Sequence, residues 1–204
     1  MSDNWQQTYT GVAFEPLHPR VDDVNLDDIA HALSNLCRFT GHTRRFYSVA
    51  EHCCRVYDCV FDALCDFGLA DSPFGVNVLR WALLHDAAEV YVNDLARPIK
   101  HAPGMEEYKA IERRLLATIS VRFRLNGGMP KEVIAADNIL LMTEARYLLG
   151  PKPQSWGDYL MSLTPLVLPW WERWSWSPWR IGWSPRRARR EFKRRALRIL
   201  RERH

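Results

Sequence analysis

Residues 83–90, with the sequence LLHDAAEV, place His85 and Asp86 side by side within an apolar run. Polar groups in such a run need partners, because burying an imidazole or a carboxylate without one is unfavourable. A divalent metal ion is such a partner. His52 lies upstream and Asp137 downstream, which gives the order His…His-Asp…Asp, each residue in a segment with a helical pattern. These four residues are therefore candidate metal ligands.

The proposed donor set combines two imidazole nitrogens with two carboxylates. Such a set suits borderline divalent ions such as Mn, Co, Fe, Ni or Zn, and suits Ca or a thiolate-type zinc site poorly. His85 and Asp86 lie about 100° apart on a helix, so one ion can reach both only over the edge between their faces. The other ligands must then come from neighbouring helices. The alternative is a buried His–Asp hydrogen bond without a metal.

Two further carboxylates follow the His-Asp pair. Glu89 lies one turn beyond His85, and Asp94 lies where the helix should end. Beside a metal ion, two carboxylates can position water and protonate a leaving group. The alternative interpretation is a solvated glutamate and an aspartate at a helix end.

Amphipathic patterns predict that helices position these residues. The capping box at residues 48–51 starts the helix that carries His52. Residues 93–94 end the helix of the His-Asp pair, and Pro98 opposes an early restart. Helices are predicted at about residues 25–37, 49–64, 76–91, 105–123, 130–149 and 184–203, after a hairpin at 8–17 around Gly11. The sequence therefore predicts an all-α protein.

The length of 204 residues predicts one domain with a sizeable core. No apolar run is long enough for a membrane span, and residues 1–4 lack the layout of a signal peptide. The cysteines lack Cys-x-x-Cys spacing, which disfavours a zinc cluster, and are interpreted as reduced thiols in or near a core. They are Cys37, Cys53, Cys54, Cys59 and Cys65. These features predict a cytoplasmic protein.

The C-terminal part of the chain is basic and rich in tryptophan. Residues 180–204 contain eleven Lys and Arg against two Glu, and six of the nine Trp lie between Trp170 and Trp183. Such a segment could bind nucleic acid or an anionic membrane. We favour an amphipathic helix docked through Ala188 and Phe192, with solvated arginines. The Trp cluster suggests a packed or oligomer-forming flap, and a homo-oligomer is expected.

Three stretches resemble the HD-domain metal-dependent phosphohydrolases. They are residues 47–52 (YSVAEH), 84–95 (LHDAAEVYVNDL) and 136–146 (ADNILLMTEAR), and the resemblance covers roughly residues 25–150. The pattern is closest to the bacterial 5′-deoxynucleotidase branch and its phage relatives, some of which are similar to dATP triphosphohydrolases. The resemblance implies one divalent ion, drawn from Co, Mn, Zn, Mg or Fe, held by His52, His85, Asp86 and Asp137.

The resemblance also implies roles for other residues. Arg38 corresponds to a phosphate-holding arginine, and Glu89 and Asp94 correspond to catalytic carboxylates. An arginine suits the first role because its planar fork binds phosphate in two places. Lys100 is a second candidate phosphate contact, with a solvated surface lysine as the equal alternative.

The substrate pocket is predicted less directly. Phe39 could stack on a base or sugar, although a core aromatic is an equally ordinary interpretation. His42 and Arg45 lie in the loop before the metal helix and could touch phosphates beyond the first, whereas a solvated loop is the plainer interpretation.

We therefore expect an all-α HD-domain helical bundle around a central divalent metal site, with the HD phosphohydrolase domain at residues 1–150 and residues 151–204 packed on it. The expected activity is metal-dependent hydrolysis of phosphate from a deoxynucleoside mono- or triphosphate, with dATP as one candidate, in the cytoplasm of a bacterial or phage-infected cell. The alternatives are a phosphodiesterase acting on a cyclic nucleotide and a nucleic-acid-binding regulatory protein that uses the basic tail.

Overall fold

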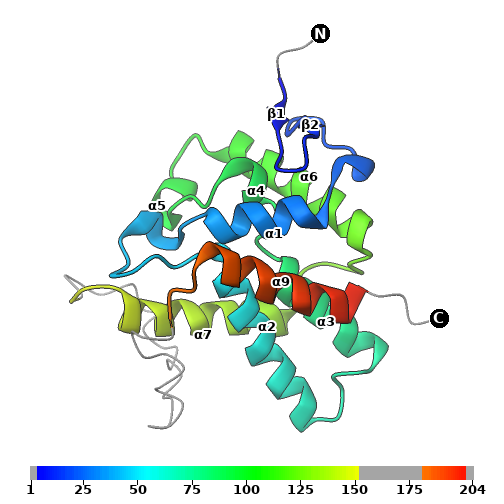
Figure 1. The fold of residues 1–204 in the computed structure, drawn as a ribbon, viewed down its shortest axis with the longest axis vertical. Helices are drawn as coiled ribbons and strands as arrows, with labels where there is room; N and C mark the ends of the chain where they lie inside the picture. Colours follow the sequence, from blue (N-terminus) through cyan, green and yellow to red (C-terminus); the bar gives the residue numbers. More distant parts are fainter. Residues whose placement is uncertain (1–3, 152–180, 201–204) are drawn as a thin grey trace.

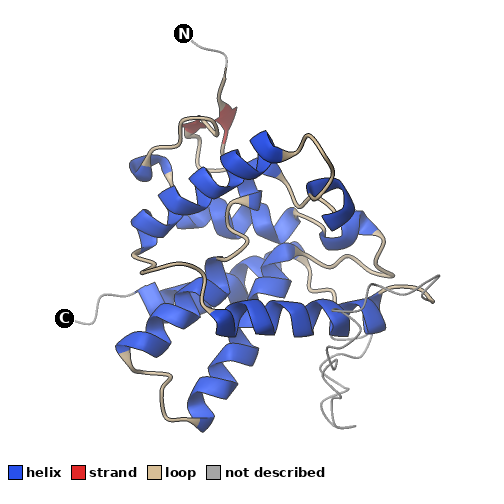
Figure 2. Cartoon of the chain, turned by 180° about the vertical axis from the view of Figure 1, so that it is seen from behind, coloured by secondary structure: helices blue, strands red, loops and turns tan. Residues whose placement is uncertain are grey.

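The computed structural model describes residues 4–151 and 181–200. Helices make up almost all of its regular structure, and one small hairpin supplies the strands (Figures 1 and 2). The prediction of an all-α protein is therefore confirmed. Within the described ranges, no helix combines the length and the apolar character that a membrane span requires.

The N-terminal hairpin pairs β1 (Gln6–Gln7) with β2 (Ala13–Phe14) in antiparallel register. Gly11 lies in its turn with a φ of 87°, a conformation that glycine adopts without strain. The hairpin is thus present as predicted, but it begins before residue 8. A short 3₁₀ turn, η1 (Val21–Asp23), leads from it to the first long helix.

The long helices pack around α2. Helix α2 contacts the first helix, the third, the seventh and the last, so it lies at the centre of the described fold. Most predicted helices are present with boundaries close to those expected. They are α1 (Leu26–Asn35), α2 (Val49–Asp66), α3 (Pro73–Leu84), α6 (Glu106–Phe123), α7 (Lys131–Leu148) and α9 (Pro185–Leu200), with the single turns α4 (Glu89–Val92) and α5 (Arg97–Lys100).

Helix α1 ends before the predicted boundary at Cys37. Leu36 is already extended, with φ −83° and ψ 122°. The chain then runs antiparallel to the entry of α2, because the Arg38 amide donates to the Tyr47 carbonyl at 2.9 Å and the Val49 amide donates to the Leu36 carbonyl at 3.0 Å. This pairing places Arg38, at the start of the 3₁₀ turn η2 (Arg38–Gly41), beside the helix that carries His52.

The predicted continuous helix over residues 76–91 is wrong in two respects. It starts earlier, because the Ser72 hydroxyl caps it and proline is tolerated in a first turn. It also stops after Leu84, and residues 85–88 form tight turns. The amide of Ala87 donates to the Leu84 carbonyl and that of Glu89 to the Asp86 carbonyl, each at 3.0 Å. Such bonds wind the backbone at about three residues per turn, which changes where His85 and Asp86 point.

A second correction concerns Pro98. The proline does not stop the chain from returning to helix, because it lies in the first turn of α5, where no amide hydrogen is needed. The short turn brings Arg97 within 3.9 Å of Asp137, one of the metal-ligand candidates.

Helix α9 packs against α1, α2 and α3, as Figure 1 shows for the first two. Ala188, Phe192, Ala196 and Ile199 are buried along one face. The docked amphipathic helix predicted from the sequence is therefore confirmed, but the prediction that its arginines are solvated is wrong for Arg195, which is buried and donates to Asp58 at 2.6 Å. Residues 152–180, which include every Trp of the cluster except Trp183, lie outside the described residues.

The entry to α9 is fixed by Glu51, which is fully buried. The Trp183 amide donates to one carboxylate oxygen of Glu51 at 2.7 Å, and Arg55 donates to the other at 2.6 Å. The capping box is thus only half formed. The Ser48 hydroxyl accepts a hydrogen bond from the Glu51 amide, but the Glu51 carboxylate accepts from the Trp183 amide instead of from the Ser48 amide. Gly182 approaches so closely that a β-carbon there would lie 2.7 Å from the Phe46 carbonyl oxygen.

All five cysteines are free, and two of them belong to the core. Cys53 and Cys54 are buried on α2, and burial raises the pKa of the Cys54 thiol to about 12. The interpretation as reduced core thiols holds for these two, whereas Cys65 is exposed.

The first prediction tests the docking of α9. We expect Phe192→Ala to lower the free energy of unfolding by about 3–5 kcal/mol, because the ring is fully buried. Leu197→Ala, at an exposed position of the same helix, should change it by less than about 0.5 kcal/mol. Urea denaturation followed by circular dichroism measures both. Equal effects would show that the helix is not docked through this face.

Candidate metal centre

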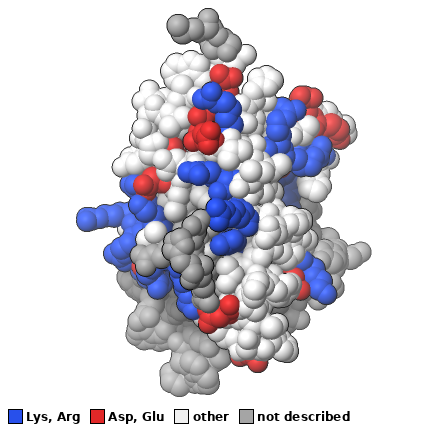
Figure 3. All heavy atoms as spheres, turned by 90° about the vertical axis from the view of Figure 1, so that its right-hand side faces the viewer, with Lys and Arg blue, Asp and Glu red and all other residues white. Residues whose placement is uncertain are grey.

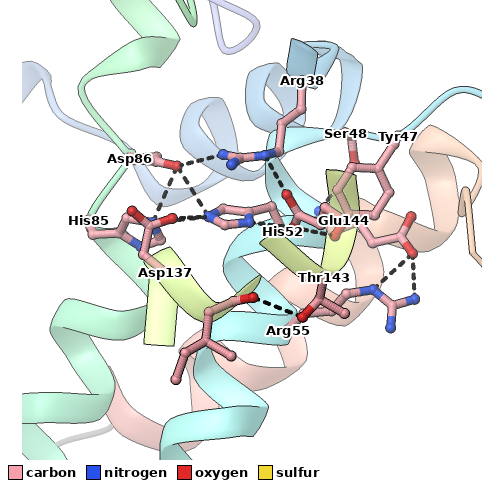
Figure 4. Close-up of polar contacts among 12 residues, drawn as sticks. Arg38, Tyr47, Ser48, His52, Arg55, His85, Asp86, Asp137, Thr143 and Glu144 are labelled. Carbon is pink, nitrogen blue, oxygen red and sulfur yellow. Dashed lines mark hydrogen bonds and ion pairs between the residues drawn. The ribbon is translucent and has the colours of Figure 1, made fainter. Parts of the chain in front are cut away.

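Three side chains from two elements converge on one point (Figure 4). The facing ligand atoms of His52, His85 and Asp86 all lie within 4.8 Å of one another. Asp86 Oδ2 is 3.2 Å from His85 Nε2 and 3.7 Å from His52 Nε2, and the two Nε2 atoms are 3.3 Å apart. Among the described residues, no other group of three or more His, Cys, Asp and Glu side chains lies close enough together to share a metal ion.

The opposite nitrogen of each imidazole faces an acceptor. Nδ1 of His52 lies 2.6 Å from Glu144 Oε1, and Nδ1 of His85 lies 2.9 Å from the Ala82 carbonyl oxygen. Both Nδ1 atoms therefore carry hydrogen and donate it. Each Nε2 faces the other ring and a carboxylate, and a metal ion that displaces any proton there could bind both nitrogens. The donor chemistry thus fits a divalent ion.

Asp137 comes close to this group but is not part of its compact core. Its Oδ1 atom lies 3.1 Å from His52 Nε2, reached from α7. The carboxylate of Asp137 does not lie within 4.8 Å of all three of the other ligand atoms. The structure therefore brings Asp137 to the site as predicted, beside the first histidine.

The electrostatics of the cluster favour a cation. Burial opposes a charged His52, but Glu144 and Asp137 outweigh burial and raise the pKa of His52 to about 9. Burial likewise opposes the ionised form of Asp137, but its hydrogen bond with His52 lowers the pKa to about 2. The pKa of Asp86 is also held below its ordinary value by His85, His52 and Arg38, against the effect of burial. Carboxylates that stay ionised here attract a proton or a metal ion to the space between them.

Arg38 and Glu144 form a second layer behind the ligands. Arg38 Nε donates to Glu144 Oε2 at 3.2 Å, and Nη1 donates to Asp86 Oδ2 at 3.4 Å. The Tyr47 hydroxyl donates to Glu144 Oε1 at 2.8 Å. Within the described chain, these contacts use two of the five N–H groups of Arg38, so the guanidinium keeps donors for an anion.

Glu89 and Asp94 lie on the same side as Asp86. Glu89 is buried, and among the described residues its Oε2 atom has no hydrogen-bond partner. Burial and the charges of Asp86 and Asp94 raise the pKa of Glu89 well above its ordinary value. Burial also raises the pKa of Asp94. Two neighbouring carboxyl groups that hold protons more firmly than usual are suited to proton transfer.

The remaining predicted substrate residues differ in their surroundings. Lys100 donates to Glu112 Oε1 on α6 at 2.5 Å, so its charge is partly balanced. Phe39 is half-buried in the left-handed region, with φ 53°, and its ring lies 5.5 Å from the Arg38 guanidinium carbon. A non-glycine residue held in this backbone conformation is strained, and such strain often occurs at functional sites. His42 and Arg45 are exposed in the following loop, and their contact with substrate stays a prediction.

Arg97 was not singled out from the sequence. Its Nη2 atom donates to Asn138 Oδ1 at 3.2 Å and lies 3.9 Å from Asp137 Oδ2, while half of the side chain is exposed. No pattern marks it, because it lies in a single helical turn that Pro98 was expected to prevent. The position of Glu144 two turns after Asp137 on one helix face did signal its place in the second layer.

The fold and the site together define an all-α protein with a buried His/His/Asp group that could hold a metal ion. No protein-family model matches the chain. It is 37% identical over 142 residues to the uncharacterized protein YfdR of Escherichia coli strain K12, covering 70% of this chain and 71% of the relative. It is 33% identical over 156 residues to the uncharacterized protein RCAP_rcc00048 of Rhodobacter capsulatus, covering 74% and 76%. The chain belongs to the family of YfdR.

The second prediction is a pH dependence of metal binding. Because His52 carries a proton below about pH 9, a metal ion must displace that proton, whereas Asp86 and Asp137 are already ionised. We expect the dissociation constant for Co²⁺, followed by visible absorption, to fall about tenfold for each pH unit gained between about pH 6.5 and 8.5. Asp86→Ala should abolish the signal. An affinity that does not change with pH would contradict the assignment of His52 Nε2 as a ligand.

Proposed function

We propose that this protein is an HD-type metal-dependent phosphohydrolase that releases phosphate from deoxynucleoside mono- or triphosphates. The observation that carries the proposal is the convergence of three layers on one point. The ligands His52, His85 and Asp86 face one another, Arg38 lies against them with unused donors, and the buried carboxyl group of Glu89 has a pKa raised by burial and by the neighbouring charges of Asp86 and Asp94. The resemblance of the same stretches to HD phosphohydrolases supports it.

The residues divide the chemistry between binding and proton transfer. A divalent ion held by the His/His/Asp group, with Asp137 beside it, would act as a Lewis acid on a phosphate oxygen and make water more acidic. Arg38 binds the phosphate through its remaining N–H groups and is held in place by Glu144. Asp94 orients the attacking water or protonates the leaving oxygen, and Glu89 holds the proton that supports this exchange.

The third prediction is the activity itself. The protein is incubated with deoxynucleoside mono- and triphosphates and a cyclic nucleotide, each with Mn, Co, Mg or Zn, and phosphate, pyrophosphate and triphosphate are separated. We expect metal-dependent turnover of a deoxynucleotide, lost in Asp86→Ala. Glu89→Gln should lower kcat by about 10²–10⁴-fold with little change in KM, as expected for loss of acid–base catalysis.

The matched control is Glu107→Gln, which changes an exposed carboxylate on α6 and should leave turnover unchanged. Turnover of the cyclic nucleotide alone would replace the proposal with a phosphodiesterase. Full turnover in Glu89→Gln would remove this residue from the mechanism.

The fourth prediction distinguishes two roles for Arg38. Lysine keeps the positive charge beside Glu144, but its ammonium group lacks the planar pair of N–H donors with which a guanidinium binds phosphate. We expect Arg38→Lys to keep the metal content and to melt within a few degrees of the wild type. Its kcat/KM should fall at least about tenfold, or about 1.4 kcal/mol. Arg20→Lys, at an exposed pair with Asp23, is the matched control. Wild-type kcat/KM in Arg38→Lys would assign the arginine to structure alone.

A further inference from the structure

A separate cleft lies where the start of α3 meets the ends of α6 and α9. It encloses about 630 Å³, a volume typical of small-molecule sites. Four arginines and one carboxylate line it, and none of the metal-ligand candidates does. We call it the arginine cleft, and its charged residues are Arg80, Arg122, Arg124, Arg198 and Asp71. Figure 3 looks onto the side of the molecule at which α9 ends, where Lys and Arg are prominent.

The arginines of this cleft differ from the well-buried arginines elsewhere in the chain. Arg38, Arg55 and Arg195 each donate to at least one carboxylate, at Glu144, Glu51 and Asp58 respectively. Those charges are balanced within the fold. This pattern is the ordinary one, because a guanidinium taken out of water needs a compensating charge.

For three of the arginines in the arginine cleft, the partners are of another kind. Arg80 donates to the carbonyl oxygens of Ile199 at 3.0 Å and Arg124 at 3.3 Å. Arg122 donates to a backbone carbonyl at 3.0 Å, and Arg198 lies over an aromatic ring at 4.3 Å. Among the described residues, no carboxylate pairs with Arg80, Arg122 or Arg198. Burial, together with the charge of Arg124, lowers the pKa of Arg80.

A structural role accounts for Arg80. Its two bonds satisfy carbonyls at the ends of α9 and α6, where a positive charge is favourable. Arg122 and Arg198 are exposed and line the same hollow from different helices, although Arg122 Nε donates to the Val24 carbonyl and the Arg198 guanidinium lies over the Phe61 ring, both outside the hollow. The walls are also preformed, because the Asn126 amide donates to Asn77 Oδ1 at 2.8 Å and the Asn77 side chain donates back to the Asn126 carbonyl.

We propose that the arginine cleft binds a ligand that carries two or more phosphate groups, at a site distinct from the metal centre. Several guanidinium groups around one hollow match a chain of phosphates, because each can make charge-assisted bonds to phosphate oxygens. The half-buried ring of Phe123 on the same wall offers a surface for a base. Inorganic polyphosphate and a nucleoside triphosphate share this chemistry.

The test is calorimetric titration of the 204-residue chain with inorganic tripolyphosphate and, separately, with a nucleoside triphosphate, after removal of divalent metal. We expect both probes to bind. The double variant Arg122→Ala/Arg198→Ala should weaken the binding of tripolyphosphate at least tenfold. The matched control, Arg186→Ala/Arg190→Ala, removes two exposed arginines of α9 outside the cleft and should change it less than twofold. Thermal melting checks that both variants remain folded.

The metal centre could also attract phosphate, so each titration is repeated with Arg38→Ala. Binding retained in that variant supports the arginine cleft, and loss of binding there but not in the cleft variant overturns it. Equal weakening in the control overturns it as well, as does a failure of both probes to bind. Tighter binding of the nucleoside triphosphate would add a base contact at Phe123. Because the measured quantity is binding and not turnover, the outcome is independent of the proposed hydrolase activity.

Discussion

A single buried carboxylate, Glu144, fixes the geometry on which the candidate site depends. It is closed to solvent, yet it stays ionised because Arg38 and His52 lower its pKa against the effect of burial. Its oxygens accept from Tyr47, His52 and Arg38, which come from three successive parts of the chain. A buried negative charge without these donors would be strongly unfavourable. The carboxylate therefore holds α7, α2 and η2 in one arrangement and sets the tautomer of His52.

The outward face of this arrangement carries two ionised carboxylates. Asp86 and Asp137 stay ionised beside two imidazoles, with Arg38 lying 3.4 Å from Asp86 and the half-exposed Arg97 3.9 Å from Asp137. The local winding of residues 85–88 contributes, because it turns a histidine and the next residue toward one point instead of toward different faces of a helix. A site that attracts cations thus results from a small departure from regular helix.

Much of this arrangement was accessible from the sequence. The Ser48 cap set the start of α2, and the seven-residue spacing of Asp137 and Glu144 placed both on one face of α7. The break after Leu84 was not accessible, because its Leu- and Ala-rich sequence has strong helix propensity and only tertiary packing decides the winding. The partner of Glu51 could not be inferred either, since Trp183 lies 132 residues away. Arg97 was missed because a single exposed turn leaves no periodic pattern.

The contact between Glu51 and Trp183 has a consequence for biosynthesis. Glu51 directly precedes His52, and its carboxylate accepts hydrogen bonds from the amides of Gly182 and Trp183, which are made much later. While the ribosome is still adding residues 181–200, the groove between α1, α2 and α3 has no Phe192 or Ile199 to cover it, and Arg55 and Glu51 face it without their final neighbour. Until residues 185–200 are made, the nascent chain therefore carries its metal-ligand helix beside an uncovered, apolar-lined groove. Covering of the groove therefore follows the synthesis of α9, and a chain that stops before Phe192 would expose this groove to chaperones and proteases.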